Sequence, residues 1–258
     1  MENIRKKKAF ICDMDGVIYH GNKLLPGAAE FVNWLRSEKK DFLFLTNSSE
    51  RAPRELQEKL ARLGLDVRQD RFYTSALATA AFVAAQIPDC TAYVIGETGL
   101  INALYDAGIT MNDVNPDYVI VGESRNYTYE NILRAVKFIQ HGARLIGTNP
   151  DLTGPTEQGL VPATGALTSP IEQATGTKAY FVGKPNPLMM RTALKRLKHR
   201  REDTVIVGDR MDTDIIAGVE SEISTVLVLS GCTTKAEVER YAYRPNHILS
   251  GVGDIPPS

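Results

Sequence analysis

The sequence is poor in cysteine and has no long apolar run. Its 258 residues contain three cysteines, Cys12, Cys90 and Cys232, whose spacing matches neither a metal site nor a disulfide framework. No stretch approaches the roughly 20 consecutive apolar residues of a membrane helix, and the first residues lack the hydrophobic centre of an export signal. We therefore expect a soluble protein of the cytoplasm that has no membrane partner.

The sequence has almost no excess of either positive or negative charge. The formal net charge is -1 at pH 7, and the short basic segments 5–8 and 195–201 are typical of a solvated terminus and an exposed helix end. We therefore expect no nucleic-acid partner. Neither G-x-x-x-x-G-K-S/T nor a strand-linked G-x-G-x-x-G occurs, which leaves nucleotide-binding folds of those two kinds without support.

Four short apolar runs each end in polar or charged residues. Parallel strands that are buried on both faces read as continuous apolar runs, and their crossovers place all the carboxyl ends on one edge of the sheet. We therefore expect the residues that follow the runs to converge: Asp13 and Asp15 after residues 9–12, Thr46 and Asn47 after 42–45, Lys184 after 180–182, and Asp209, Asp212 and Asp214 after 205–207.

The charges of this set indicate a metal and a phosphate. Two carboxylates about 4 Å apart repel by roughly 4 kcal/mol at an effective dielectric near 20, so they need a cation. Hard oxygen ligands suit Mg2+, which is often shared with phosphate oxygens. Lys184 supplies a point charge for phosphate, while Thr46 supplies a hydroxyl and, with Asn47, backbone N–H groups. A carboxylate can also accept a phosphoryl group covalently.

The sequence resembles the haloacid dehalogenase-like phosphatases over essentially its whole length. Their four motifs are matched in order by Asp13-x-Asp15-Gly16-Val17, Thr46-Asn47, Lys184-Pro185 and Gly208-Asp209-x-x-x-x-Asp214. Further stretches are similar to the NagD-like branch of that family, namely residues 26–29, 72–75, 148–151 and 213–215.

The resemblance implies a two-step phosphoryl transfer with Mg2+ as cofactor. It makes Asp13 the nucleophile and Asp15 the acid that protonates the leaving alkoxide and then activates water. The implied metal ligands are Asp13, the Asp15 backbone carbonyl and Asp209, with Asp214 orienting Lys184 or a metal-bound water. The implied substrate contacts are Thr46, Asn47, Lys184, Arg210, Met211, Asp212 and Thr213 in the motifs, and Asn149 and Asp151 on a turn of the inserted domain.

Two of these segments also fit a purely structural role. Residues 210–212 have the composition of a solvated turn, and residues 148–151 that of a proline-containing turn with Asx hydrogen bonds. The residues alone leave both interpretations open.

Strand and helix patterns alternate along the chain, which predicts a three-layer, doubly wound, Rossmann-like parallel sheet. Apolar periodicity indicates helices over 28–36 and 53–63, and another that begins with Asn186 as cap and Pro187 in the first turn. The interval before Lys184 is too long for one crossover and repeats the alternation. We predict a catalytic core of residues 1–76 and 179–258 and an inserted, smaller α/β cap domain of residues 77–178.

The predicted function is a Mg2+-dependent phosphomonoester hydrolase that acts through an aspartyl-phosphate. Asp15 favours a phosphatase over a dehalogenase, because an alkoxide leaving group needs a proton. A phospho-receiver signalling module shares part of the set but would hold its phosphate without turnover, and a phosphomutase can use the same two aspartates. The substrate is a small phosphorylated metabolite of the nucleoside monophosphate or sugar/glycolyl phosphate type. A homo-oligomer formed through the cap stays open.

Overall fold

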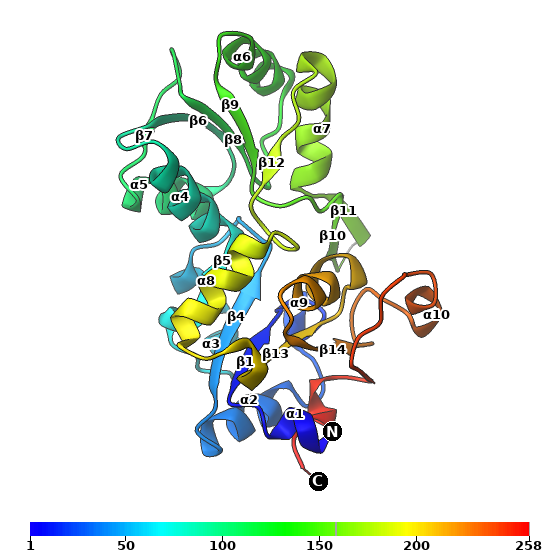
Figure 1. Ribbon diagram of the computed structural model, residues 1–258. Helices are drawn as coiled ribbons and strands as arrows, with labels where there is room; N and C mark the ends of the chain where they lie inside the picture. Colours follow the sequence, from blue (N-terminus) through cyan, green and yellow to red (C-terminus); the bar gives the residue numbers. More distant parts are fainter. Residues whose placement is uncertain (158, 258) are drawn as a thin grey trace. The chain divides into compact units, whose positions relative to one another are not determined.

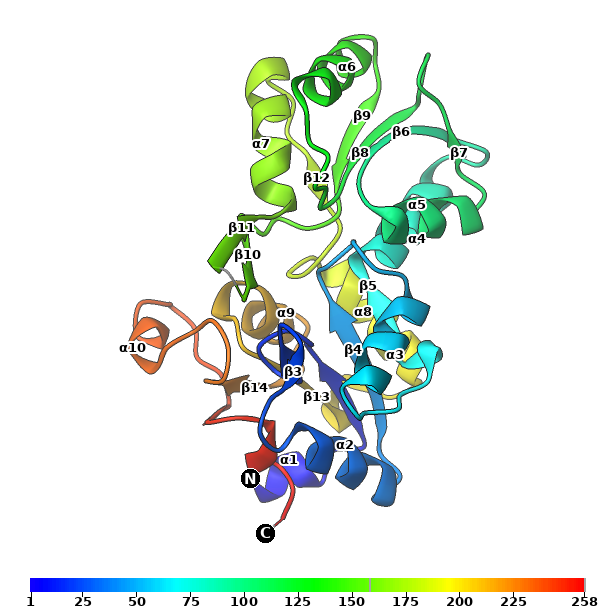
Figure 2. The ribbon, with the colours of Figure 1, turned by 180° about the vertical axis from the view of Figure 1, so that it is seen from behind.

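The computed structural model describes residues 1–157 and 159–257, which fold into two compact units. Figures 1 and 2 show them from opposite sides. The first unit contains Met1–Thr46, Gln57–Tyr73 and Lys184–Ser258, and the second contains Asn47–Leu56 and Thr74–Gly183. The predicted core also took in residues 47–56, 74–76 and 179–183, which belong to the second unit here.

A six-stranded sheet forms the centre of the first unit, in the order β15-β14-β13-β1-β4-β5. Pairing is parallel from β4 through β1, β13 and β14 to β15, and every residue of β1 and β13 is buried. The strands are β1 (Ala9–Cys12), β4 (Asp41–Thr46), β5 (Phe72–Thr74), β13 (Thr204–Gly208), β14 (Ser224–Val228) and β15 (His247–Leu249); a short hairpin joins β2 (Tyr19–His20) to β3 (Lys23–Leu24).

Helices cover both faces of this sheet. Helices α8 (Pro187–Leu197) and α9 (Ile216–Glu220) lie on the face seen in Figure 1, and α2 (Ala28–Ser37) lies on the face seen in Figure 2. The Asn186 side chain accepts the N–H of Leu188 at 3.0 Å, which confirms the predicted cap of α8. The other helices are α1 (Glu2–Arg5), α3 (Pro53–Arg62) and α10 (Lys235–Val238).

The second unit has its own sheet, in the order β12-β9-β8-β6-β7, and all its pairings are parallel. In Figure 1, α4 and α5 pack together on one face and α6 and α7 on the other. The elements are α4 (Ser75–Gln86), β6 (Thr91–Ile95), α5 (Thr98–Asp106), β7 (Thr110–Met111), β8 (Tyr118–Val121), α6 (Tyr129–Gln140), β9 (Arg144–Gly147), the hairpin β10 (Thr153–Thr156) and β11 (Gly159–Pro162), α7 (Thr164–Thr175) and β12 (Tyr180–Phe181). The two parallel sheets confirm the predicted α/β class with an inserted smaller α/β domain.

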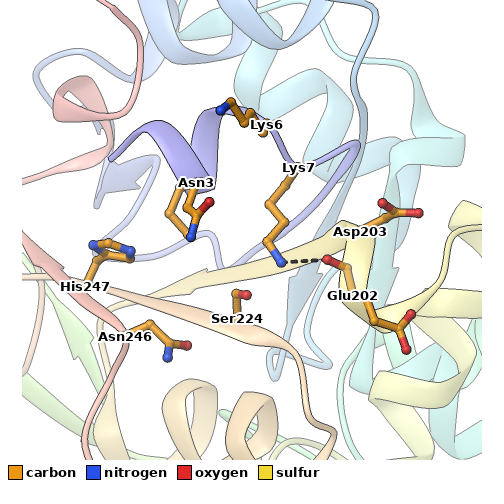
Figure 3. Close-up of a pocket in the computed structure, with 9 residues that line it drawn as sticks. Asn3, Lys6, Lys7, Glu202, Asp203, Ser224, Asn246 and His247 are labelled. Carbon is orange, nitrogen blue, oxygen red and sulfur yellow. Dashed lines mark hydrogen bonds between the residues drawn. The ribbon is translucent and has the colours of Figure 1, made fainter.

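A hollow of about 360 Å³ lies at the amino ends of β14 and β15, where Ser224 and His247 line it (Figure 3). Lys7 crosses it and donates from Nζ to the Glu202 carbonyl at 2.6 Å. The strands run away from this hollow, so it is remote from their carboxyl ends. None of the described helices combines the length and apolarity needed to cross a membrane.

Candidate active site

A buried lysine joins two aspartates at the carboxyl end of the first sheet. Asp13 directly follows β1, and Lys184 Nζ donates to Asp13 Oδ1 at 2.5 Å and to Asp214 Oδ1 at 2.7 Å. A third bond reaches the Leu45 carbonyl, near the end of β4, at 3.0 Å. The Lys184 side chain is only 2% exposed. Burial alone would lower the pKa of Lys184, but Asp13 and Asp214 outweigh it and raise the pKa.

Asp209, directly after β13, completes a carboxylate cluster. Asp13, Asp209 and Asp214 each offer an oxygen within 4.8 Å of the others. Burial raises the pKa of Asp13 well above its usual range; Lys184 opposes this, and Asp214 and Asp209 add to it. Burial, reinforced by Asp214, also raises the pKa of Asp209 to about 6. The Lys184 ammonium offsets one of these three charges, so this all-oxygen set suits a hard divalent cation.

Backbone without side chains lies directly against the Asp209 carboxylate, because glycines stand at the neighbouring positions. Asp209 Oδ2 accepts the N–H of Cys232 at 2.6 Å. A Cβ built on Gly231 would lie 2.0 Å from the same oxygen, and one on Gly16 would lie 2.5 Å from it. Gly16 also has a φ of +77°, which other residues rarely adopt. Glycine is therefore needed at both positions if Asp209 is to keep its place.

Asp15 is set apart from this cluster. Its side chain is 36% exposed, and its Oδ1 lies 3.4 Å from His20 Nδ1 in the short hairpin. The N–H of Gly16 donates to the Tyr19 carbonyl at 2.8 Å, which turns the chain after Asp15. The two aspartates of the first motif thus have different surroundings. No sequence pattern indicated His20, which lies close to Asp15 only because of this turn.

The segment after Asp209 begins with a π-helical turn, Met211–Ile215. Arg210 and Asp212 pair with each other through contacts of 3.1 and 3.0 Å, so the solvated-turn interpretation fits these two residues but is wrong for the buried Met211. Met211 packs in a buried cluster with Ile215, Leu227 and Val238, and Thr213 is buried. Contact of residues 210–213 with a substrate stays a prediction.

Thr46 is the last residue of β4 and is buried, whereas Asn47 already belongs to the second unit. There Asn47 Nδ2 donates to Asp151 Oδ2 at 2.9 Å, and Asn149 Nδ2 donates to the Asn47 carbonyl at 2.8 Å. The N–H of Asp151 donates to Asn149 Oδ1 at 3.1 Å, the Asx hydrogen bond expected of a turn. The second unit thus groups the candidates Asn47, Asn149 and Asp151.

Known proteins resemble this chain over almost its full length. A model of haloacid dehalogenase-like hydrolases matches residues 10–110, and a HAD-hydrolase-like model matches residues 181–255. A protein of Corynebacterium glutamicum named dihydroxyacetone phosphatase is 46% identical over 96% of this chain and 90% of its own length. The chain belongs to the haloacid dehalogenase-like hydrolases.

Within this family, the chain is similar to members of the NagD-like branch. The ribonucleotide monophosphatase NagD of Escherichia coli is 44% identical over 96% of this chain and 98% of its own length. The solved structure of NagD matches with a TM-score of 0.91 at 43% identity, covering 97% of this chain and 99% of that one. These comparisons confirm the predicted resemblance to NagD-like members of the haloacid dehalogenase-like hydrolases.

Proposed function

We propose that this protein is a Mg2+-dependent phosphatase that hydrolyses small phosphorylated metabolites through an aspartyl-phosphate on Asp13. Its relatives are named phosphatases, which supports the class of phosphomonoester hydrolase. The observation that carries the mechanism is Lys184, buried and bonded to Asp13 and Asp214 beside Asp209. A location in the cytoplasm stays a prediction.

Asp13 supplies the nucleophilic oxygen in the proposed first step. A bond forms between an Asp13 carboxylate oxygen and phosphorus, and the bond between phosphorus and the ester oxygen breaks. Asp15, which is partly exposed and lies outside the carboxylate cluster, gives its proton to the leaving alkoxide. Burial disfavours the anionic Asp13 that this attack needs, and Lys184 favours it.

Water reverses these roles in the second step. Asp15 takes a proton from water, whose oxygen bonds to phosphorus as the bond to Asp13 breaks, so inorganic phosphate leaves and Asp13 is restored. Asp13 and Asp209, with the Asp15 carbonyl, would hold Mg2+, which when bound neutralises charge on the phosphoryl oxygens. Thr46 and Asn47 would hold those oxygens, and Asp214 would keep Lys184 oriented.

Phosphate release from a panel of monoesters tests this function. The panel should include a nucleoside monophosphate, a triose phosphate, a sugar phosphate and an aryl phosphate, with Mg2+ or with excess chelator. We expect continuous release with Mg2+, loss of release in chelator, and recovery when Mg2+ is added back. A single turnover without further release would favour a receiver module. Full activity in chelator would exclude the metal.

Replacing Gly231 with alanine should weaken the metal site without unfolding the protein. The new Cβ would lie 2.0 Å from Asp209 Oδ2, so Asp209 must shift. We expect the Mg2+ concentration for half-maximal activity to rise about 10- to 100-fold, the usual cost of disturbing a ligand's surroundings. Gly251→Ala is the matched control, because its Cβ would meet nothing closer than 3.9 Å. An equal Mg2+ requirement in both variants would contradict this prediction.

A further inference from the structure

Glu123 has no role in the mechanism above, although it receives hydrogen bonds from two separate segments. It follows β8 in the second unit. Its Oε2 accepts the N–H of Ser49 at 2.9 Å and the Ser49 hydroxyl, and its Oε1 accepts Asn149 Nδ2 at 3.0 Å. The N–H of Glu123 in turn donates to Ser49 Oγ at 3.2 Å. Burial raises the pKa of Glu123, and the bonds from Ser49 oppose this shift.

These bonds fix three residues, Asn47, Asn149 and Asp151, that we call the Asn47 block. Asn149 Nδ2, held by Glu123, also donates to the Asn47 carbonyl at 2.8 Å. The Asn47 side chain reaches Asp151 at 2.9 Å, and Ser75 Oγ donates to the Asn47 carbonyl at 2.5 Å. Glu123 is thus connected to Asn47 in two ways. It bonds to Ser49, two residues after Asn47 in the chain, and it bonds to Asn149, which in turn donates to the Asn47 carbonyl.

Close packing leaves the Asn47 block little freedom to shift. A Cβ on Gly183 would lie 2.6 Å from the Thr148 carbonyl and 2.8 Å from Asn47 Oδ1, and a Cβ on Gly122 would lie 2.6 Å from Ser49 Oγ. The N–H of Gly183 also donates to the Thr148 carbonyl at 2.7 Å. Gly183 immediately precedes Lys184, and Asn47 immediately follows Thr46. The Asn47 block therefore lies next in sequence to two of the predicted catalytic motifs.

We propose that Glu123 is a positioning residue that orients Asn47 and Asp151 toward the substrate. This inference rests on the proposed function, in which Asn47 holds the phosphoryl oxygens, and on the predicted contact of Asp151 with the substrate. An ionised carboxylate only accepts hydrogen bonds, so it matches donors from Ser49 and Asn149 at once. Glutamine has the same shape, but one of its two terminal groups is an NH2 group, which can only donate. That group would face one of these two donors, and the hydrogen bond there would be lost.

Glu123→Gln should therefore lower kcat/KM about 10- to 100-fold, the expected cost of a lost hydrogen bond to a charged group. Glu97→Gln is the matched control. Glu97 follows a glycine at the end of β6, as Glu123 does at the end of β8, and accepts the Arg125 N–H at 2.8 Å without touching the Asn47 block. Ser49→Ala, which keeps the backbone donor, should give a smaller loss and serves if Glu123→Gln folds poorly.

A double-mutant cycle separates positioning from stability. If Glu123 acts through Asn47 and Asp151, Glu123→Gln should change kcat/KM less than about twofold once Asn47→Ala and Asp151→Ala are both present. Additive losses would overturn the proposal, as would equal losses in Glu97→Gln.

Hydrogen exchange of the Ser49 amide gives a second readout that needs no substrate. Exchange should be faster in Glu123→Gln than in Glu97→Gln, and unchanged exchange would overturn the proposed contact. A wild-type protein that releases no phosphate from any ester would instead refute the proposed function, and this exchange measurement would still decide whether Glu123 holds the segment.

Discussion

Asp13→Asn should lower phosphate release by on the order of 10⁴-fold or more, because an amide cannot form the aspartyl-phosphate. The substitution nearly preserves the shape of the side chain. Lys184 Nζ, 2.5 Å from Asp13 Oδ1, can still find an amide oxygen, so the fold should survive. The measurement is the rate of phosphate release with Mg2+, together with mass spectrometry of the acid-quenched protein for a phosphoryl adduct on the chain.

Asp15→Asn is the informative comparison for that result. It keeps the nucleophile and removes the acid, so its residual activity should favour an aryl phosphate, whose leaving group needs little protonation, over an alkyl phosphate. Asp13→Asn should show no such preference and no adduct. Near-normal Mg2+-dependent turnover by Asp13→Asn would eliminate the aspartyl-phosphate route.

The carboxylate cluster of the first unit was predictable from the sequence, because the geometry of parallel strands determines where its residues lie. Asp13 and Asp209 follow buried parallel strands, and such strands place their carboxyl ends on one edge whatever the loops do. Asn186 and Pro187 are likewise a local signal for the start of α8, and both stand where predicted. The nucleophile and its neighbours could therefore be placed together from strand ends alone.

Contacts that depend on distant segments were not predictable in this way. The segment after Thr46 belongs to the second unit because Ser49 and Asn47 bond to Glu123 and Asn149, which are 74 and 102 positions away in sequence. No local pattern encodes that pairing. One signal was nevertheless available, since Glu123 and Asn149 also follow buried strands of a parallel sheet.

Which side chains are buried or closely packed was also not predictable from the sequence. Met211 sits in a motif between charged residues, yet it points into an apolar cluster, because a π-helical turn directs it inward. The closeness of Gly231 to Asp209 comes from the loop after β14, and only the folded chain shows that a methyl group there would lie 2.0 Å from a carboxylate oxygen.

Lys184→Met should abolish activity and also lower the free energy of unfolding, by about 3–5 kcal/mol in excess chelator. The ammonium that is lost bonds to Asp13 at 2.5 Å and to Asp214 at 2.7 Å, and both carboxylates would remain without their cation. Lys195→Met, on the exposed surface of α8, is the control for loss of one lysine charge and should leave activity and stability nearly unchanged.

Adding Asp214→Asn to Lys184→Met should restore stability but not activity. The second change removes one of the two uncompensated charges, and an asparagine oxygen can still accept the Arg210 N–H that Asp214 Oδ2 receives at 3.2 Å. We therefore expect urea unfolding of the double variant to recover at least half of the lost free energy. Phosphate release should stay absent, because no ammonium then lies beside Asp13 to favour its anion. A double variant as unstable as Lys184→Met would show that charge balance does not hold these residues together, and an active one would show that Lys184 is dispensable.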